Sequence, residues 1–245
     1  MAVQPSANPH PQEPGPLANA LVTLAGTPDH AHDVGSQLMA IAKLAANRIG
    51  ATTYASVTAL TGRVHVTVAV SDELVRAVDE AQYTDSAGPC IEALHTGTPV
   101  GVPDIAATVQ WPHFHEEAPR LGLHASVSVP LCASRGEPIA ALNLYGHDSA
   151  AMAPLIDGIC VVHEHSSGTT AGSDDLHLLD EGGRELVTGY AEALSIRATI
   201  RLALSVIMNE LHCGADDAYL ALCIRAGQAG TDLARAAGRL LTQGI

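Results

Sequence analysis

Residues 176–211 read LHLLDEGGRELVTGYAEALSIRATIRLALSVIMNEL, a proline-free run with apolar side chains at alternating spacings of three and four. Gly183 and Arg197 are the non-apolar interruptions of this stripe. The stripe consists of Leu176, Leu179, Gly183, Leu186, Tyr190, Ala193, Arg197, Ile200, Leu204, Ile207 and Leu211. Such a heptad period predicts a long helix that pairs with a second copy of the chain as a parallel coiled coil. The alternative is a single long helix packed on its own domain.

Two shorter helices are expected after this run, with the sequences ADDAYLALCIRA (215–226) and TDLARAAGRLL (231–241). The segment His212-Cys213-Gly214 is expected to end the long helix, because glycine readily supplies a left-handed or non-helical turn. Asp216 and Asp217 stand in the first turn of the next helix, where the helix dipole favours carboxylates. Apolar residues of both helices would face Ile207 and Met208. The tail is therefore predicted to be a small three-helix cluster.

The tail resembles the ANTAR domain of bacterial transcription antiterminators over about the last 50 residues. The segments SIRATIRLALSVIM (195–208) and ADDAYLAL (215–222), followed by a short third helix, carry the resemblance. The matching positions are Arg197, Ile200, Ala203, Met208, Ala218, Leu222, Leu233 and Ala237. Members of that family bind paired RNA hairpins as dimers and prevent a terminator from forming. The resemblance implies RNA contacts at Arg197, Arg201, Ser205, Arg225, Arg235 and Arg239.

Several polar positions of the family pattern are replaced in this chain. Cys223, Ala226, Gly230, Asp232 and Ala234 stand where the family has arginine, serine, asparagine, lysine and arginine. RNA affinity depends heavily on neutralised phosphates, and loop bases are recognised by stacking and hydrogen bonds. These departures leave a second hypothesis open, in which the tail is a dimerisation or protein-docking module without RNA binding.

The chain is acidic, with 12 Lys and Arg against 26 Asp and Glu residues and a formal net charge of −14. From Tyr190 onward there are five arginines and five acids, so the remaining seven basic and 21 acidic residues, a balance of −14, precede that position. The acidic front part would repel nucleic acid and membrane surfaces, whereas the neutral tail neither strongly attracts nor repels them.

The cysteines and the N-terminus indicate a cytoplasmic protein. Five scattered cysteines without a C-x-x-C pair favour reduced thiols over a disulfide framework. The first residues, MAVQPSANPHPQEPGPL, lack the basic and apolar regions of a signal peptide. No uncharged apolar run reaches the ~18 residues of a membrane span. We expect a soluble, cytoplasmic protein without a membrane partner.

The remainder of the chain predicts an α+β domain behind a disordered, proline-rich leader at residues 1–16. Apolar residues recur with helical period from Asp33 to Arg48. Strands are expected at 52–60, 63–70, 100–102, 125–131, 138–146 and 158–165, and helices at 90–95, 111–123 and 149–156. Residues 72–80 fit a short helix or a loop, and SSGTTAGSDD (166–175) fits a flexible joint.

Three motifs in this region, GPCIEALHTG (88–97), QWPHFHEEAPRLGLHASVSVPL (110–131) and AALNLYG (140–146), resemble a GAF domain. More narrowly, they resemble the GAF domains of actinobacterial proteins that carry a C-terminal ANTAR segment. The resemblance spans roughly residues 33–165. It implies a sensory fold, an antiparallel sheet flanked by helices, that binds a small molecule or a partner. The predicted domains are the leader 1–16, a GAF-like sensor 17–170, a linker and coiled-coil helix 171–195, and an ANTAR-like domain 196–245.

The sequence offers little argument for catalysis or metal binding. His163 and His165 would share a face of a strand and could ligate a metal together. His113 and His115 would need a loop, because residues two apart on a helix point about 200° apart. Solvated or capping histidines are the alternative, and we expect no metal and no cofactor. Cys90 fits a packed core position better than a nucleophile, since a catalytic cysteine also needs a base and an oxyanion site.

No nucleotide-binding, zinc-protease or serine-hydrolase motif occurs, so we expect no enzyme. The sequence predicts a dimeric GAF–ANTAR regulator of transcription antitermination. Its partners would be structured RNA, a second copy of itself, and a small-molecule or protein signal at the GAF domain.

Overall fold

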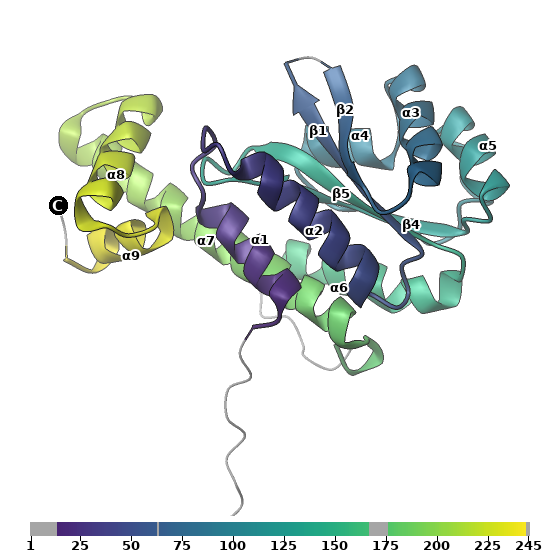
Figure 1. The fold of residues 1–245 in the computed structure, drawn as a ribbon. Coiled ribbons are helices and arrows are strands. Elements are labelled where there is room, and N and C mark those ends of the chain that lie inside the picture. Colours follow the sequence, from purple (N-terminus) through teal and green to yellow (C-terminus); the bar gives the residue numbers. More distant parts are fainter. Residues whose placement is uncertain (1–13, 63, 167–175, 244–245) are drawn as a thin grey trace, which may run out of the picture.

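The computed structural model describes residues 14–62, 64–166 and 176–243. Five strands form one antiparallel sheet in the order β2-β1-β5-β4-β3, with helices on both of its faces (Figure 1). A long helix leaves this assembly and carries two further helices at its end. The predicted α+β class, with a helical tail, is confirmed.

The sheet contains the five strands that the sequence places before residue 150. They are β1 (Tyr54–Thr61), β2 (Val64–Val70), β3 (Val100–Val102), β4 (Ala125–Cys132) and β5 (Pro138–Gly146). In the three central strands, Asn143 on β5 is paired with Ser56 on β1 and with Ser128 on β4. Alternate residues therefore give the sheet one apolar face and one polar face.

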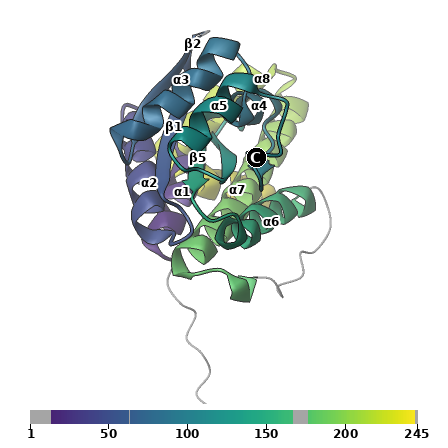
Figure 2. The ribbon, with the colours of Figure 1, turned by 90° about the vertical axis from the view of Figure 1, so that its right-hand side faces the viewer.

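Four helices cover the apolar face of the sheet. They are α1 (Pro16–Gly26), α2 (Val34–Arg48), α6 (Ser149–His165) and the first half of α7 (Glu181–Leu211). On the other face lie α3 (Arg76–Asp85), introduced by a 3-10 turn at Glu73–Val75, then α4 (Pro89–Thr96) and α5 (Pro112–Arg120). Figure 2 shows the sheet between these two groups of helices.

The structure corrects two predictions on the apolar face. Residues 158–165, predicted as a strand, belong to α6, because Met152, Leu155, Ile156 and Ile159 recur with helical spacing and are buried together. The side chain of Asp148 caps this helix by accepting hydrogen bonds from the backbone of its first turn. Helix α1 was not predicted, although Pro16 occupies a position where proline favours helix initiation.

The heptad stripe is covered from within the chain. Residues 176–178 form a 3-10 turn, and α7 begins at Glu181 after the side chain of Asp180 caps it. Leu179, Leu186 and Tyr190 are buried in the core beside the sheet, and α1 packs along this half of α7. Most of the seam that would pair with a second copy is therefore occupied within the chain, although Leu211 at its end is 51% exposed. The alternative of a helix packed on its own domain is confirmed.

Close packing and one buried carboxylate hold α7 in place. A Cβ atom at Gly189 would lie 2.5 Å from the Cα of Ala18, and one at Gly182 would lie 2.0 Å from the backbone oxygen of Arg48. Glu185 accepts hydrogen bonds from the backbone N–H of Leu17 at 2.9 Å and from Nε of Arg48 at 2.9 Å. One side chain thereby joins α1, α2 and α7.

The second half of α7 forms a separate core with α8 (Ala215–Ala229) and α9 (Leu233–Gln243). Ile200, Ala203 and Ile207 contribute to it from α7, whereas Leu194 still belongs to the core beside the sheet. The predicted three-helix cluster is confirmed. His212, not Gly214, adopts the left-handed conformation that ends α7, with φ of 51°.

Some predictions fall on segments that the structure does not describe. The leader at 1–16 lies outside the described residues up to position 13, while Pro16 already belongs to α1. The joint at 166–175 lies outside them from position 167 onward. Among the described helices, none combines the length and apolar character that crossing a membrane requires.

Substituting Gly189 should test the packing of α7 on α1. In Gly189→Ala the new methyl group meets the backbone of Ala18, so we expect the free energy of unfolding to fall by about 1–3 kcal/mol. Gly238→Ala on α9 is the matched control, because a Cβ atom there has no neighbour within 4 Å. That variant should be neutral or gain up to ~1 kcal/mol from helix propensity. Urea unfolding followed by circular dichroism measures both, and equal stability of the two variants would contradict the packing.

Candidate functional site

A buried polar layer lies between the sheet and helices α3 and α4. The strands alternate between apolar and polar residues, a pattern that predicts a solvent-exposed polar face. Helices α3 and α4 cover that face instead. The buried polar side chains of the layer are Ser56, Thr58, Thr67, Asp79, Gln82, Ser126, Ser128 and Asn143. Because buried polar groups are costly unless hydrogen-bonded, such a layer marks a place where the fold keeps polar chemistry at the expense of stability.

Asp79 on α3 is the centre of this layer and is fully buried. Its carboxylate accepts hydrogen bonds from the hydroxyl groups of Ser56 at 3.0 Å, Thr67 at 2.9 Å and Tyr145 at 2.8 Å. Three strands thus converge on one acid. None of the ion pairs within residues 14–62, 64–166 and 176–243 includes Asp79.

Burial raises the pKa of Asp79 to about 6, because the charged form loses its hydration. The three hydroxyl donors, together with the charge of Arg76, act in the opposite direction and lower it. The side chain therefore changes charge in the slightly acidic range, far above the ordinary pKa of an aspartic acid. Strongly shifted pKa values of buried acids occur preferentially at functional sites, so Asp79 is a candidate functional residue.

The network extends from Asp79 toward α4. Gln82 donates to the hydroxyl oxygen of Tyr145 at 3.3 Å and accepts a hydrogen bond from the backbone N–H of Cys90 at 2.9 Å. The hydroxyl of Tyr83 lies 2.7 Å from that of Thr67 and 2.9 Å from that of Thr58. Burial raises the pKa of both Tyr83 and Tyr145, so both remain protonated donors. The layer thus links α3, α4 and the sheet through polar contacts, beside the apolar contacts of Ile91 and Leu94 with Ala141.

Hydrogen-bonding capacity remains unused in this layer. Asn143 donates through Nδ2 to Ser56 at 3.1 Å and Thr58 at 3.0 Å, but its buried Oδ1 has no partner among the described residues. The same holds for Oγ of Ser126 and Nε2 of His65. Buried polar atoms normally find a partner, so these atoms are suited to a small polar ligand or bound water.

A second feature connects the sheet to the C-terminal helices. The turn between β4 and β5 carries Ser134, whose hydroxyl lies 2.6 Å from that of Tyr219 on α8. Arg135 pairs with Asp216 at 2.7 Å and places its guanidinium carbon 4.5 Å from the centre of the Tyr219 ring. The backbone oxygen of Gly136 accepts a hydrogen bond from Arg197 at 2.5 Å. We call Ser134, Arg135 and Gly136, with these contacts, the β4–β5 latch.

The structure distributes the predicted RNA-contacting residues over three helices. Arg197, Arg201 and Ser205 lie four residues apart on α7, on one helical face. Arg197 is half-buried in the latch, whereas Arg201 and Ser205 are exposed and joined by a hydrogen bond from Oγ of Ser205 to the backbone oxygen of Arg201 at 3.0 Å.

The other three predicted positions lie on α8 and α9. Arg225 is half-buried on α8, and Arg235 and Arg239 are exposed on α9. Arg235 lies 3.6 Å from Asp232 in an ion pair. Of the five predicted arginines, Arg197 and Arg235 thus use their guanidinium groups in contacts within the chain.

The histidine pairs considered as metal ligands lie on helices. His163 and His165 are both on α6, so the shared strand face that was predicted for them does not exist. His163 stacks on Tyr190, with Nδ1 2.8 Å from its hydroxyl. His113 contacts Asp85, and Nδ1 of His115 lies 3.0 Å from the backbone oxygen of Ile105. Across the described part of the chain, no group of three or more His, Cys, Asp or Glu side chains is placed to hold a metal ion.

Cys90 and Trp111 are buried, as core residues would be. Burial raises the pKa of the Cys90 thiol well above its usual range, which keeps it protonated. Trp111 packs edge-on against Phe114 in the core beneath α3 and α5.

Sequence reasoning missed the residues that organise the polar layer and the latch. The spacing of Ser56 and Thr58, and of Asn143 and Tyr145, gives each strand a polar face, which the pattern alone would assign to solvent. Asp79 is followed directly on α3 by Glu80, which is exposed, so the pair does not mark either acid as buried. The available signal was the recurrence of hydroxyl side chains on adjacent strands.

Comparison with known proteins identifies the sheet domain. The GAF domain family matches residues 32–154, half of the chain. Among solved structures, the chain is similar to a protein described as a type II free methionine-R-sulfoxide reductase from Thermoplasma acidophilum, at 14% identity and a TM-score of 0.38. That similarity covers 71% of this chain and 94% of the reductase. No curated protein matches this sequence.

The reductase corrects one prediction. The sequence predicts no enzyme, and that prediction is contradicted by the presence of a reductase among the similar structures. A TM-score of 0.38 carries no activity from the reductase to this chain.

The raised pKa of Asp79 predicts how stability depends on pH. Unfolded chains release this proton near the ordinary value of 3.8, whereas the folded chain holds it up to about pH 6. Between these values the folded state binds more protons, so the free energy of unfolding falls as the pH rises. Asp79→Asn removes this titration. From about pH 3.5 to about pH 7, we expect the stability of wild type relative to the variant to fall by about 3 kcal/mol.

Urea unfolding at a series of pH values measures this difference. Asp217→Asn, which removes an exposed acid on α8, is the matched control for the loss of one negative charge. A pH-independent difference between wild type and Asp79→Asn would show that Asp79 titrates normally.

Proposed function

We propose a function from one premise: the chain belongs to the GAF domain family. A GAF domain indicates a sensory, ligand-binding role, and the polar layer around Asp79 is our candidate for the sensing site. The C-terminal unit of α7, α8 and α9 is our candidate for the output. We propose that this output binds structured RNA and regulates transcription by antitermination.

The β4–β5 latch is the observation that supports a coupled sensor. Its two strands also carry Ser126, Asn143 and Tyr145, which belong to or adjoin the polar layer. The turn that joins these strands contacts Arg197 on α7 and Tyr219 on α8. A ligand that rearranges hydrogen bonds in the layer would shift β4 and β5, and the latch would transmit that shift to the C-terminal unit.

We propose two states of the latch. In the engaged state, the backbone oxygen of Gly136 holds Arg197, and Arg135 holds α8 through Asp216 and Tyr219. In the released state, Arg197 would join Arg201 and Ser205 on an open face of α7. A ligand can favour the released state only by binding it more tightly, so the layer must bind its ligand differently in the two states.

RNA binding is supported by the resemblance of the tail to ANTAR domains and by the exposed cations. Arg201 and Arg239 are exposed and take part in no ion pair within the described residues. Arginine recognises phosphate through a planar, bidentate donor arrangement, which suits the backbone of hairpin RNA. Paired hairpins are the proposed RNA partner.

A second candidate function is protein docking without RNA, and one observation favours it. Leu220 and Ile224 lie one turn apart on α8 and are 58% and 51% exposed. The tail carries equal numbers of acids and arginines, which gives RNA little electrostatic attraction. A second copy of this chain could occupy the face with Leu220 and Ile224, which keeps the predicted homodimer as a proposal on a surface other than the heptad stripe.

Substitution of the exposed Arg201 and Arg239 by glutamine tests the RNA proposal. We expect the double variant Arg201→Gln, Arg239→Gln to bind a tandem-hairpin RNA at least about tenfold more weakly than wild type at ~100 mM salt, because two phosphate contacts are lost. Between ~100 mM and ~300 mM salt, wild-type affinity should fall more steeply than that of the variant. Fluorescence anisotropy with labelled RNA measures both quantities.

The matched control removes two exposed cations from the sensor domain. Lys43→Gln, Arg120→Gln has the same change in net charge, on α2 and α5, and should bind as wild type does. If folded wild-type protein does not bind, or if both double variants lose the same affinity, the RNA proposal fails. In that case Leu220→Ser, Ile224→Ser tests docking, and a loss of self-association in sedimentation would favour the second candidate.

Release of the latch should loosen α8. Arg135→Gln removes an exposed ion pair and a cation–π contact, together worth about 1 kcal/mol. We expect backbone amides of α8 to exchange with deuterium about fivefold faster, with no change in α5. Arg120→Gln breaks a comparable exposed ion pair with Glu117 and should leave α8 unchanged. If exchange in α8 is the same in wild type and Arg135→Gln, the latch does not hold the C-terminal unit.

A further inference from the structure

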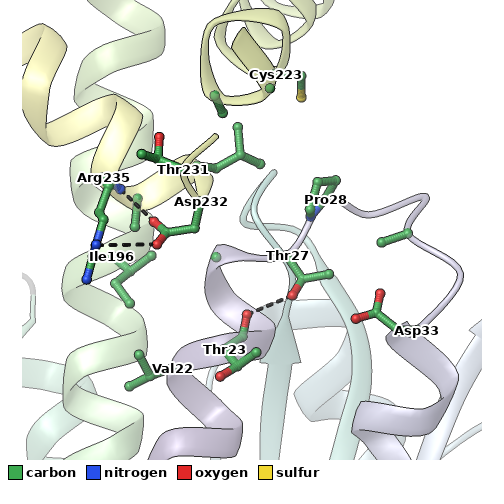
Figure 3. A pocket seen from close by; sticks show the side chains of 16 residues that line it. Val22, Thr23, Thr27, Pro28, Asp33, Ile196, Cys223, Thr231, Asp232 and Arg235 are labelled. Atoms are coloured by element: carbon green, nitrogen blue, oxygen red, sulfur yellow. Dashed lines mark hydrogen bonds and ion pairs between the residues drawn. The ribbon is translucent and has the colours of Figure 1, made fainter. Parts of the chain in front are cut away.

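A cleft of about 730 Å³ separates the start of the sensor domain from the C-terminal unit. One wall is the end of α1 with the loop that leads to α2, the other is the end of α8 with the start of α9, and Ile196 on α7 also lines it (Figure 3). The cleft lies apart from the polar layer, because none of its lining residues belongs to that layer. Its size falls within the range of small-molecule sites, which often form between domains.

Most of the lining is aliphatic, with Val22, Ile196, Leu233 and several alanines. A few polar groups are placed among these side chains. Thr231 contributes a buried hydroxyl that has no hydrogen-bond partner among the described residues. An apolar enclosure with a small number of unused polar groups binds a ligand that has an apolar body and a polar end.

The charges in the cleft indicate the sign of that polar end. Asp232 caps α9 by accepting from the backbone N–H of Arg235 at 2.7 Å, and its other oxygen lies 3.6 Å from Nε of Arg235. These two charges therefore compensate each other. Asp33 at the start of α2 accepts one hydrogen bond, from Gln37 to Oδ2 at 2.7 Å. It forms no ion pair within the described ranges, and its Oδ1 accepts no hydrogen bond there, so the uncompensated charge of the cleft is negative.

We infer that this cleft binds a small amine with an aliphatic body. The ammonium group pairs with the carboxylate of Asp33, and the hydrocarbon part lies against Val22, Ile196 and Leu233. Figure 3 shows Asp33 and Asp232 projecting from opposite walls, the latter joined to Arg235. A ligand in this position bridges the two parts of the molecule that the latch also connects. The site is independent of the proposed RNA function and of the ligand of the polar layer.

Binding of three matched probes to the full chain tests this inference. Hexylamine, hexanol and hexanoic acid share a six-carbon body and differ in charge. We expect hexylamine to bind wild-type protein with a Kd of about 1 mM or less, hexanol about threefold more weakly, and hexanoic acid more weakly still. Chemical shifts of backbone amides of Val22, Ile196 and Thr231 should change on titration with the amine.

Two variants place the amine in the cleft. Asp33→Asn keeps the shape of the side chain and an acceptor for Gln37 but removes the charge, and should weaken hexylamine binding about threefold. Gly227→Leu fills the cleft, because a Cβ atom at Gly227 has no neighbour within 4 Å, and should abolish binding without lowering the melting temperature. Asp217→Asn, which removes an acid outside the cleft, should bind as wild type does.

Three results would overturn the inference. The first is the absence of hexylamine binding to wild-type protein. The second is equal binding of the three probes, or unchanged hexylamine binding in Asp33→Asn, which would show that the charge plays no part. The third is a preference for hexanoic acid that is lost in Arg235→Gln, which would assign an anion site to the opposite wall.

Discussion

Glu185 accepts hydrogen bonds from the first turn of α1 and from Arg48 at the end of α2, at a place where Gly182 and Gly189 let the backbones approach closely. This contact binds α7 to the sensor domain, so the position of everything that follows on the chain depends on it. A buried carboxylate is tolerated there because Arg48 compensates its charge and Leu17 satisfies a second lone pair. The same helix α1 covers the apolar stripe of α7, through Leu17, Leu21 and Leu24, and this coverage distinguishes the stripe from a coiled-coil seam.

The two faces of the sheet follow opposite physical rules. Toward α1, α2, α6 and α7 the strands present alanine, valine and leucine, whose burial is favourable and requires no directional contact. Toward α3 and α4 they present hydroxyl and amide groups around Asp79, each of which needs a correctly oriented partner. The first face is suited to holding the domain together. The second is suited to rearrangement, because hydrogen bonds can be exchanged among neighbours of similar chemistry.

The sequence predicts local structure well where one period dominates. The helix at Val34–Arg48 and both strands of the β1–β2 hairpin have a consistent pattern and were found near their true bounds. At residues 158–165, β-branched residues suggested a strand, but burial of Ile159 with Met152 and Leu155 favours a continuous helix. The heptad stripe predicts a buried face but does not show which element covers it. The covering helix is α1, whose Leu17 contacts Glu185 across 168 positions of the chain. The latch could not be predicted for the same reason, because contacts between distant residues leave no period in the sequence. The strands do alternate at the polar layer, but alternation alone does not show that α3 and α4 cover the polar face.

Helix α7 passes from one core to the other without a break. The number of residues between the two cores therefore sets both the rotation and the distance of the C-terminal unit relative to the sheet. One residue inserted between Leu194 and Ile200 would turn that unit by about 100° and advance it by about 1.5 Å. Both cores would survive intact, but Tyr219 would no longer face the β4–β5 turn. Seven inserted residues would restore the facing to within about 20° while moving the unit away by ~10 Å. The number of helix residues between the two cores thus fixes whether the latch can form. Related chains that keep the latch should tolerate changes of length in their loops but not in this part of the helix.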